Sequence, residues 1–272
     1  MSNVSSPSSP SSLGTALITG ASTGIGAIYA DRLAQRGYDL ILVARQADRL
    51  AALANRLATR HGRTVEALAA DLGDPAQLLR VEDRLQQDAG ITMLVNNAGI
   101  GTHTPLLESN VDYMTQMLQL NVVALTRLAY AAVPGFIARG RGAIVNIASI
   151  VAITPEMLNG VYGGSKAFVL AFSQSLHHEL GARGLHVQAV LPGATATDFW
   201  ALGGRPVEHL PKEIVMSAED MVDAALVGFD RGELVTIPAL RDESQWQALD
   251  TARRSMFGEL SRNSPAPRYA KA

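Results

Sequence analysis

Short apolar segments recur along the chain, and longer segments of helical length separate them. The apolar runs lie at about 13–19, 38–44, 64–69, 91–95, 142–148, 185–191 and 233–237. Helices are predicted to begin at Asp74-Pro75 and at Ser217, where a capping side chain or a proline precedes good helix formers. Strands that alternate with helices favour a parallel sheet with right-handed crossovers. We therefore predict an α/β fold, a single doubly wound domain with a seven-stranded, mostly parallel sheet and helices on both faces.

The two ends of the chain fall outside this alternation. Residues 1–12 contain seven serines and two prolines, so they cannot bury enough apolar surface to order themselves, and we predict a disordered tail. We assign 13–240 to the main domain, with the substrate site inside it, and 241–272 to a C-terminal helical extension. The apolar residues of this extension fall largely on one helical face: Trp246, Leu249, Met256, Phe257 and Leu260. That face should pack against the chain's own domain or, as the alternative, against a partner subunit.

Composition excludes several classes of protein. The 272 residues are 47% hydrophobic, which allows a substantial core, and the net charge of -2 without a basic run gives no support for nucleic-acid binding. The chain has no cysteine, so we predict neither disulfides nor a metal site, and a cytoplasmic location is compatible with this. No uninterrupted apolar stretch approaches the roughly 18 residues of a membrane span, and no signal peptide is evident. We expect no membrane partner.

A glycine-rich turn follows the first apolar run. Residues 19–26 read Thr-Gly-Ala-Ser-Thr-Gly-Ile-Gly, and helix-forming residues continue to Arg36. Glycine permits positive φ angles and a close approach of phosphate to the main chain, and a helix N-terminus offers free N–H groups to that phosphate. The spacing differs from the Gly-x-Gly-x-x-Gly of the general dinucleotide fingerprint. A tight turn between packed elements is the alternative, but the flanking pattern favours diphosphate binding.

The end of the second apolar run indicates which dinucleotide binds. An acidic residue at this position would bind the adenosine ribose 2′-hydroxyl, whereas an arginine accommodates a 2′-phosphate. Here Ala44 stands in place of the acid and Arg45 follows it. A guanidinium can make charge-assisted contacts with a phosphate that a carboxylate would repel. We therefore predict NADP rather than NAD, although Arg45 as an ordinary surface arginine is the alternative.

A tyrosine and a lysine four residues apart are the candidate catalytic pair. Tyr162 and Lys166 would share one face of a helix, and Ser149 stands thirteen residues before the tyrosine. An adjacent cation favours the phenolate, which brings the phenol closer to the pH range useful for proton exchange with a carbonyl or alcohol. A half-buried tyrosine beside a solvated lysine is the alternative when the pair is considered alone.

Taken together, these motifs resemble those of the short-chain dehydrogenase/reductase family, Rossmann-fold NAD(P)-dependent oxidoreductases, from about Leu13 to Pro238. The resemblance implies hydride transfer between a nicotinamide and a carbonyl or secondary alcohol. It implies a catalytic set of Asn121, Ser149, Tyr162 and Lys166. The cofactor contacts that it implies are Gly20, Ser22, Thr23, Gly24, Ile25, Gly26, Arg45, Asp71, Leu72, Asn97, Ala98, Gly99, Tyr162, Lys166, Pro192, Gly193 and Thr195.

Each catalytic residue has an expected role. Tyr162 is the general acid for carbonyl reduction, and Ser149 orients the substrate oxygen. Lys166 lowers the pKa of the phenol and, by the resemblance, holds the ribose hydroxyls of the nicotinamide. Asn121 holds a water that links Lys166 to solvent, or it satisfies a helix kink. A catalytically silent NADP-binding regulator is the alternative function, which the complete catalytic set disfavours.

The substrate should be a small carbonyl compound or alcohol. Its pocket walls are expected from residues 150–159 and 199–213, and the second segment reads as a mobile lid or a plain connecting loop. The apolar candidates are Ile150, Val151, Ile153, Met157, Leu158, Phe199, Trp200 and Leu202, which favour an apolar substrate. Glu156, His209 and His103 read as solvated or loop residues. Helices at about 112–138 and 161–182 resemble those through which the family forms homodimers and homotetramers.

Overall fold

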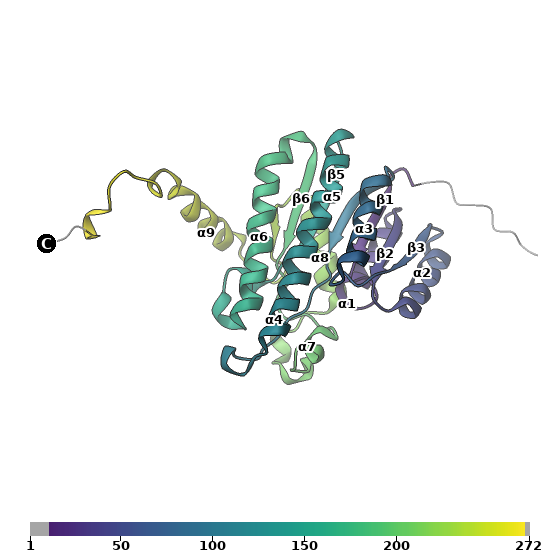
Figure 1. The fold of residues 1–272 in the computed structure, drawn as a ribbon, viewed down its shortest axis with the longest axis horizontal. Helices are drawn as coiled ribbons and strands as arrows, with labels where there is room; N and C mark the ends of the chain where they lie inside the picture. The colour runs from purple at the N-terminus through teal and green to yellow at the C-terminus, as the bar shows by residue number, and fades with distance from the viewer. Residues whose placement is uncertain (1–10, 270–272) are drawn as a thin grey trace, which may run out of the picture. The chain divides into compact units, whose positions relative to one another are not determined.

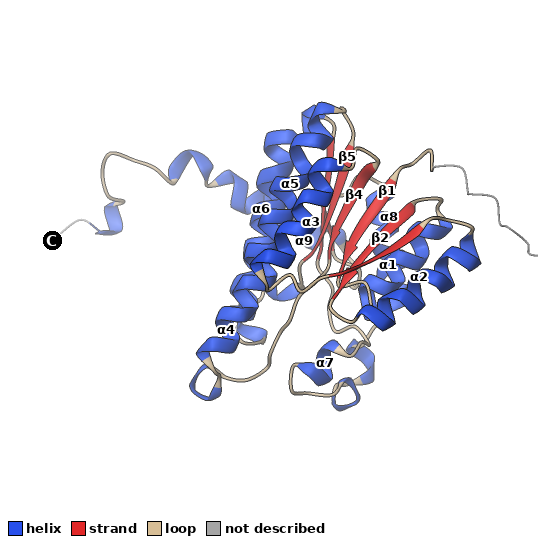
Figure 2. Cartoon of the chain, turned by 45° about the vertical axis from the view of Figure 1, so that its right-hand side comes forward, coloured by secondary structure: helices blue, strands red, loops and turns tan. Residues whose placement is uncertain are grey.

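The central element of the structure is one sheet of seven parallel strands (Figures 1 and 2). The computed structural model describes residues 11–269, and it divides the chain into one unit that ends at Pro238 and another that begins at Ala239. The sheet belongs to the first unit, its order is β3-β2-β1-β4-β5-β6-β7, and every pairing is parallel. The strands are β1 Thr15–Thr19, β2 Asp39–Ala44, β3 Val65–Ala69, β4 Ile91–Asn96, β5 Gly142–Ile147, β6 Leu185–Val190 and β7 Val235–Thr236. The predicted doubly wound fold is confirmed.

Helices cover both faces of the sheet. One face packs against α1 (Gly24–Gln35), α2 (Ala47–His61) and α8 (Ala218–Asp230). The other packs against α3 (Pro75–Gln87), α5 (Leu125–Ala138) and α6 (Gly160–Leu180). Successive residues of a strand point to opposite faces, so Ala16 and Ile18 join the first core cluster while Leu17 joins the second. This two-sided burial explains why the strands read as continuous apolar runs.

The predicted helix starts lie where capping chemistry places them. Asp74 caps α3, because its carboxylate accepts hydrogen bonds from two main-chain N–H groups and Pro75 occupies the first helical position. Ser217 caps α8 by accepting from the N–H of Asp220 at 2.9 Å. The shorter helical segments are η1 Leu106–Glu108, η3 Ile150–Ala152, η4 Pro155–Met157, η5 Gly181–Arg183, α7 Phe199–Leu202, η6 Val207–His209 and η7 Lys212–Ile214. The predicted lid segment therefore consists largely of short helices.

A 28-residue helix, Val111–Ala138, is long and apolar enough to cross a membrane by length and composition. It combines α4 (Val111–Leu118), a π-helical stretch η2 (Gln119–Ala124) and α5. In the most apolar part of this helix, 44% of the residues are buried inside the protein, and α5 packs on the sheet. Its π-helical stretch contains Asn121, and π-bulges in helices occur frequently at functional sites.

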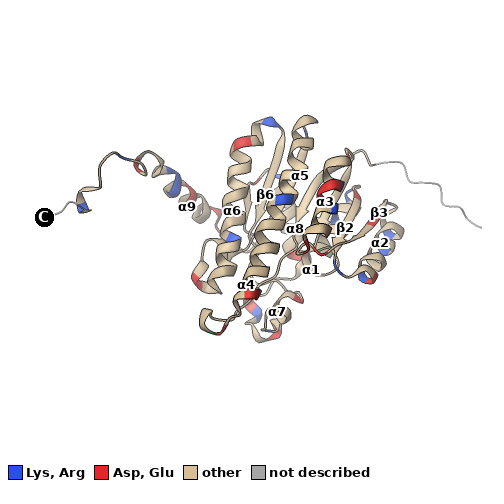
Figure 3. Cartoon of the chain, viewed as in Figure 1, with Lys and Arg blue, Asp and Glu red and all other residues tan. Residues whose placement is uncertain are grey.

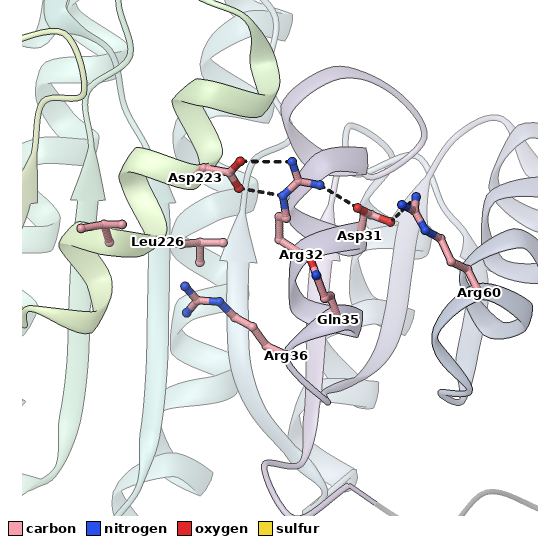
Figure 4. A pocket seen from close by; sticks show the side chains of 8 residues that line it. Asp31, Arg32, Gln35, Arg36, Arg60, Asp223 and Leu226 are labelled. Carbon is pink, nitrogen blue, oxygen red and sulfur yellow. Dashed lines mark hydrogen bonds and ion pairs between the residues drawn. The ribbon is translucent and has the colours of Figure 1, made fainter.

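A surface depression between α1, α2 and α8 is lined with ion pairs (Figure 4). Arg32 contacts Asp223 on α8 at 2.7 Å and Asp31 at 2.8 Å, and Arg60 of α2 contacts Asp31 at 3.3 Å. These acidic partners balance the guanidinium charges and connect the three helices. The depression also lies along the C-terminal half of α1, whereas the glycine turn is at the N-terminal end of that helix. We therefore assign it a structural role.

The two ends of the described chain differ from the sheet domain. Ser11 donates its hydroxyl to the carbonyl of Gly37 at 2.6 Å, so the predicted disordered tail 1–12 is too long by at least this residue; residues 1–10 lie outside the described part. In the second unit, α9 (Glu243–Ser255) precedes η8 (Phe257–Glu259) and η9 (Pro267–Tyr269). None of the residues of α9 is buried, and Leu249 is exposed. Packing of this apolar face stays a prediction.

Candidate active site

The candidate site lies where the connections from β1 and β4 diverge to opposite faces of the sheet. In open α/β sheets, ligands bind at such a switch point, beyond the carboxyl ends of the strands. Thr19, at the end of β1, joins the two connections: its hydroxyl accepts from the N–H groups of Asn97 and Ala98, both at 3.0 Å. The Asn97 side chain donates back to the carbonyls of Thr19 and Gly20 at 2.9 and 3.1 Å. Sequence reasoning missed Thr19 as this junction.

The glycine turn requires its glycines for two separate reasons. Gly20 and Gly24 adopt φ angles of +63° and +54°, which a side chain disfavours. Gly26 has no such angle, but a Cβ there would lie 2.3 Å from the carbonyl oxygen of Gly20 and 2.5 Å from the Asn97 amide. The absence of side chains thus lets the turn and the start of α1 pack together.

The N-terminus of α1 has the properties of an anion site. Thr23 is its N-cap residue and makes no side-chain capping bond, so the first N–H groups of the helix stay available to a ligand. Ser22 and Thr23 lie in the turn, and the side chain of Ile25 packs against the core, which leaves its main chain to face a ligand. Thr197 lies 3.1 Å from a Cβ placed on Gly24, so the segment after β6 borders the turn. These residues fit the diphosphate of a dinucleotide.

The residues predicted to bind the adenosine half lie at the ends of β2 and β3. Arg45 directly follows β2, is exposed, and has no ion-pair partner among residues 11–269. Asp71 and Leu72 follow β3, with Leu72 buried and one carboxylate oxygen of Asp71 accepting from the Gly73 N–H at 2.9 Å. The sheet therefore brings these residues to the same edge as the glycine turn.

Ser149 and Tyr162 form the centre of the candidate catalytic group. Ser149 follows β5 and is buried, and the adjacent Ile150 donates its main-chain N–H to the Pro192 carbonyl at 3.0 Å, which ties the ends of β5 and β6 together. Tyr162 is near the start of α6, where Asn159 caps the helix by accepting from its N–H. Burial raises the pKa of the Tyr162 phenol to about 12, and the nearby Ser149 hydroxyl partly offsets this by lowering it.

Lys166 lies one helical turn after Tyr162 and is buried. Its ammonium donates to the Ile147 carbonyl at 2.8 Å and lies 5.9 Å from the centre of the Tyr162 ring. Burial lowers the pKa of this lysine to about 8. The sequence predicts that Lys166 makes the Tyr162 phenol more acidic than free tyrosine. This prediction is wrong for the pKa of Tyr162 in the folded chain, which is raised. Loss of solvation around the phenol outweighs the effect of the neighbouring groups.

Asn121 fixes the connection that follows β4. Its amide oxygen accepts from the N–H of Ile100 at 2.9 Å, and its nitrogen donates to the carbonyl of Ile100 at 2.8 Å and to the Ser165 hydroxyl at 3.2 Å. A Cβ on Gly99 would lie 3.0 Å from the Asn121 oxygen and 3.6 Å from the Lys166 ammonium. Asn121, Tyr162 and Lys166 are thus brought together around Gly99 and Ser165, because the Ser165 hydroxyl also donates to the Tyr162 carbonyl at 2.8 Å.

Both predicted substrate walls contribute residues that lie close to Tyr162, the candidate catalytic tyrosine. Val151 belongs to the same apolar cluster as Tyr162, and Leu158 and Phe199 pack against that cluster. Met157 and Leu202 are exposed, as are Glu156 and His209. Sequence reasoning missed the cluster members that come from the β4 connection and α4: Ile100, Tyr113, Met114 and Met117. The helical spacing of Met114 and Met117 could have indicated a buried face, but not which residue it meets.

His103 has a structural role that its sequence position did not predict. Its Nδ1 donates to the carbonyl of Gly203 at 3.2 Å, and its ring stacks on Trp200 with centroids 4.9 Å apart. Trp200 also donates its indole N–H to the Thr195 carbonyl at 2.9 Å. Thr195 is buried, and its hydroxyl donates to the carbonyl of Gly193 at 3.2 Å. The segment after β6 is therefore connected to the segment after β4.

Comparison with known proteins extends these observations. The sequence profile of the short chain dehydrogenase family matches residues 14–203. A short-chain dehydrogenase from Sphingobium yanoikuyae, solved in complex with NADPH, is 50% identical, with a TM-score of 0.92 over 94% of this chain and 100% of that one. A bulky-bulky ketone specific alcohol dehydrogenase from Comamonas testosteroni is 44% identical, with a TM-score of 0.87 over 95% and 99%.

A relative of known sequence matches a smaller share of its own length. The very-long-chain 3-oxoacyl-CoA reductase of Anas platyrhynchos is 33% identical over 192 residues, which are 67% of this chain and 60% of that protein. The family profile covers more than half of the chain, and its matched region contains the glycine turn and all four catalytic candidates. The chain belongs to the short chain dehydrogenase family.

Proposed function

We propose that this protein is an NADP-dependent oxidoreductase that transfers a hydride between the nicotinamide and an apolar ketone or the corresponding secondary alcohol. The observation that carries the proposal is the position of Tyr162, which is buried beside Ser149 in an apolar cluster at the carboxyl end of the sheet. A proton donor in such surroundings suits a neutral, apolar carbonyl substrate. A catalytically silent regulator would have no need for this arrangement.

Each of the four candidate side chains has a separate role in the proposed reaction. Bound NADPH supplies the hydride. Tyr162 donates the proton to the carbonyl oxygen, and Ser149 orients that oxygen by hydrogen bonding. The ammonium of Lys166 holds a positive charge next to the phenol while it bonds the Ile147 carbonyl. Asn121 holds the main chain at Ile100 in place, and this connection forms one wall of the apolar cluster.

The preference for NADP rests on Arg45. The guanidinium follows β2 directly, where a 2′-phosphate would lie, and Ala44 leaves no carboxylate there to repel it. The 50% identical short-chain dehydrogenase of Sphingobium yanoikuyae was solved with NADPH, which supports the same choice. The 44% identical alcohol dehydrogenase of Comamonas testosteroni is described as specific for bulky-bulky ketones, which supports an apolar ketone with two large substituents.

A homodimer or homotetramer in the cytoplasm completes the proposal. The helix Val111–Ala138 exposes Val123 and Tyr130, and α6 exposes Phe168. Figure 3 shows few charged residues along α5 and α6. Apart from its histidines, α6 carries two ionisable charged residues, Lys166, which is buried, and Glu179, which is exposed near the end of the helix. Uncharged, partly apolar helix faces suit symmetric contacts between copies. Light scattering should give a molar mass that is a multiple of 28.8 kDa, and a single-chain mass would contradict this part.

The proposed activity is tested by following NADPH oxidation with purified protein. The panel should contain an aryl methyl ketone, a ketone with two large apolar substituents, an aldehyde and a charged 2-oxo acid. We expect turnover with the apolar ketones, little with the 2-oxo acid, and less with NADH in place of NADPH. Binding of NADPH without turnover of any carbonyl or alcohol would favour the regulator instead.

A further inference from the structure

The aromatic ring of Phe199 lies against the catalytic tyrosine. Phe199 is the first residue of α7, and its ring centre is 5.8 Å from that of Tyr162, with 44° between the ring planes. Among the described residues, Phe199 is the one aromatic residue whose ring contacts the ring of Tyr162. The ring also packs against the cluster that contains Val151 and Met117. A ketone bound to the phenol must therefore place one of its substituents next to Phe199.

A glycine on the opposite segment makes this position of the ring possible. A Cβ on Gly101 would lie 2.4 Å from the Cζ atom of Phe199 and 3.1 Å from the Cε2 atom of Tyr162. The φ angle of Gly101 is not in the left-handed region, so the backbone itself would accept an alanine. The carbonyl of Gly101 is held by the Tyr113 hydroxyl, which donates to it at 3.1 Å. Glycine is therefore needed at position 101 because of the close contact with Phe199, and not because of a turn conformation.

The rest of α7 is attached to the same segment. His103 contacts Gly203 and Trp200 as described above, and Gly203 is packed so closely that its Cβ would lie 3.3 Å from the Gly101 carbonyl oxygen. Two glycines therefore face each other where α7 meets the connection after β4. This close packing positions Phe199 relative to Tyr162 and limits how far the ring can move while α7 stays in place.

We propose that Phe199 determines which ketone substituent fits beside Tyr162, and that Gly101 is required for the ring to reach that position. The inference rests on the proposed ketone reductase activity. A flat aryl group or a short alkyl group can lie along the phenyl ring, whereas a branched substituent must compete with it for space. The size of residue 199 thus sets the steric limit on one side of the carbonyl.

The experiment compares two ketones that differ in one substituent, an aryl methyl ketone and the same aryl tert-butyl ketone. The quantity measured is R, the kcat/KM for the branched ketone divided by that for the methyl ketone. We expect Phe199→Ala to raise R roughly tenfold or more, and Phe199→Leu to raise it less, since pocket size commonly changes specificity by about 10- to 200-fold. Leu79→Ala is the control, because Leu79 is an exposed leucine of α3 and does not belong to the apolar cluster around Tyr162. Its R should equal that of the parent.

Gly101→Ala tests the second half of the inference. In the parent it should displace the Phe199 ring and change R. In the Phe199→Ala background the change in R should be much smaller, because the 2.4 Å contact with the Phe199 ring is gone and only the 3.1 Å contact with the Tyr162 ring remains. An equal change in both backgrounds would overturn the role of Gly101. If the parent reduces ketones but R stays within twofold in both Phe199 variants, the inference is wrong and the proposed function stands. If the parent reduces no ketone at all, both are wrong.

Discussion

Burial of Lys166 should make the stability of the folded chain depend on pH in a way that one substitution isolates. The side chain is 6% exposed, and among residues 11–269 its ammonium donates to one acceptor, the Ile147 carbonyl at 2.8 Å. Burial lowers the pKa of the lysine from 10.5 to about 8. The folded chain therefore holds this proton less tightly than the unfolded chain does. Below pH 8 both states are protonated, and the folded state carries the full cost of a buried charge.

The sign of the pH dependence follows from proton counting. Between pH 8 and 10.5 the unfolded chain binds more protons at this site, so the free energy of unfolding rises as the pH rises. For these two pKa values, the gain between pH 7 and pH 9.5 is about 2 kcal/mol. Tyr162 does not oppose it in this window, because its raised pKa of about 12 matters only above the ordinary value of 10.0.

The assay is urea denaturation of the parent and of Lys166→Met at pH 7 and pH 9.5, without added cofactor and at one protein concentration. The free energy of unfolding of the parent minus that of the variant should increase by about 2 kcal/mol between the two pH values. The sequence has only three lysines, so the background from other lysines is small. Lys212→Met is the matched control, since Lys212 is exposed, and its difference from the parent should not change with pH.

A change of less than about 0.5 kcal/mol in the Lys166→Met comparison would refute the reasoning. It would mean that the ammonium keeps an ordinary pKa in the folded chain, either because water reaches it or because an anionic group compensates the burial. An effect of the opposite sign would mean that the folded state binds the proton more tightly than the unfolded state. In both cases the buried-charge description of the catalytic pair would have to be abandoned.

Three further substitutions test the rest of the site. Tyr162→Phe should lower kcat more than tenfold and leave NADPH affinity within twofold of the parent, because only the proton donor is lost; a variant with a tenth of the parent kcat or more would require another acid. Arg45→Ala should weaken NADPH binding by about 1.5–3 kcal/mol in a fluorescence titration and leave NADH binding unchanged, and equal affinities of the parent for both cofactors would contradict the assignment. Gly26→Ala should lower the free energy of unfolding by at least about 1–3 kcal/mol and weaken NADPH binding, because the new Cβ would lie 2.3 Å from the Gly20 carbonyl oxygen. Gly164→Ala is the control: a Cβ there has no atom within 4 Å, so this variant should not be less stable than the parent.

Local sequence signals were sufficient for the fold and for the choice of candidate catalytic residues, which the structure brings close together. A parallel strand buried on both faces leaves a continuous apolar run, and the connection that follows it begins at the carboxyl end of the sheet. For this reason the positions of the glycine turn, Asn97 and Ser149 followed from their places after strands. Tyr162 and Lys166 share a helical face by spacing alone. These relations depend on short segments, which the sequence specifies directly.

The contacts that the sequence did not predict join segments far apart along the chain. Phe199 meets Gly101, and His103 meets Trp200, only because the connections after β4 and β6 converge above the sheet. The π-helical stretch around Asn121 was anticipated no more closely than as a possible helix kink. The direction of the Tyr162 pKa was predicted wrongly for the same reason. A motif names the charged neighbour, but the degree of burial depends on every residue that packs around the phenol.

Phe199 connects the two properties of the site, because the ring that limits the pocket also helps to exclude water from the phenol. Burial is the larger influence on Tyr162 and raises its pKa to about 12. Phe199→Ala should therefore return the pKa of Tyr162 toward the ordinary value of 10.0. The difference in ultraviolet absorbance between Phe199→Ala and Phe199→Ala/Tyr162→Phe, followed through an alkaline titration, isolates this one phenol, and the matching pair in the parent background gives the reference. If both pairs titrate at the same pH, other residues keep the phenol dry, and variants at position 199 can alter substrate size without altering the acid. If the titration shifts as expected, a larger pocket comes with a more acidic phenol, and specificity and proton transfer cannot be changed independently at this position.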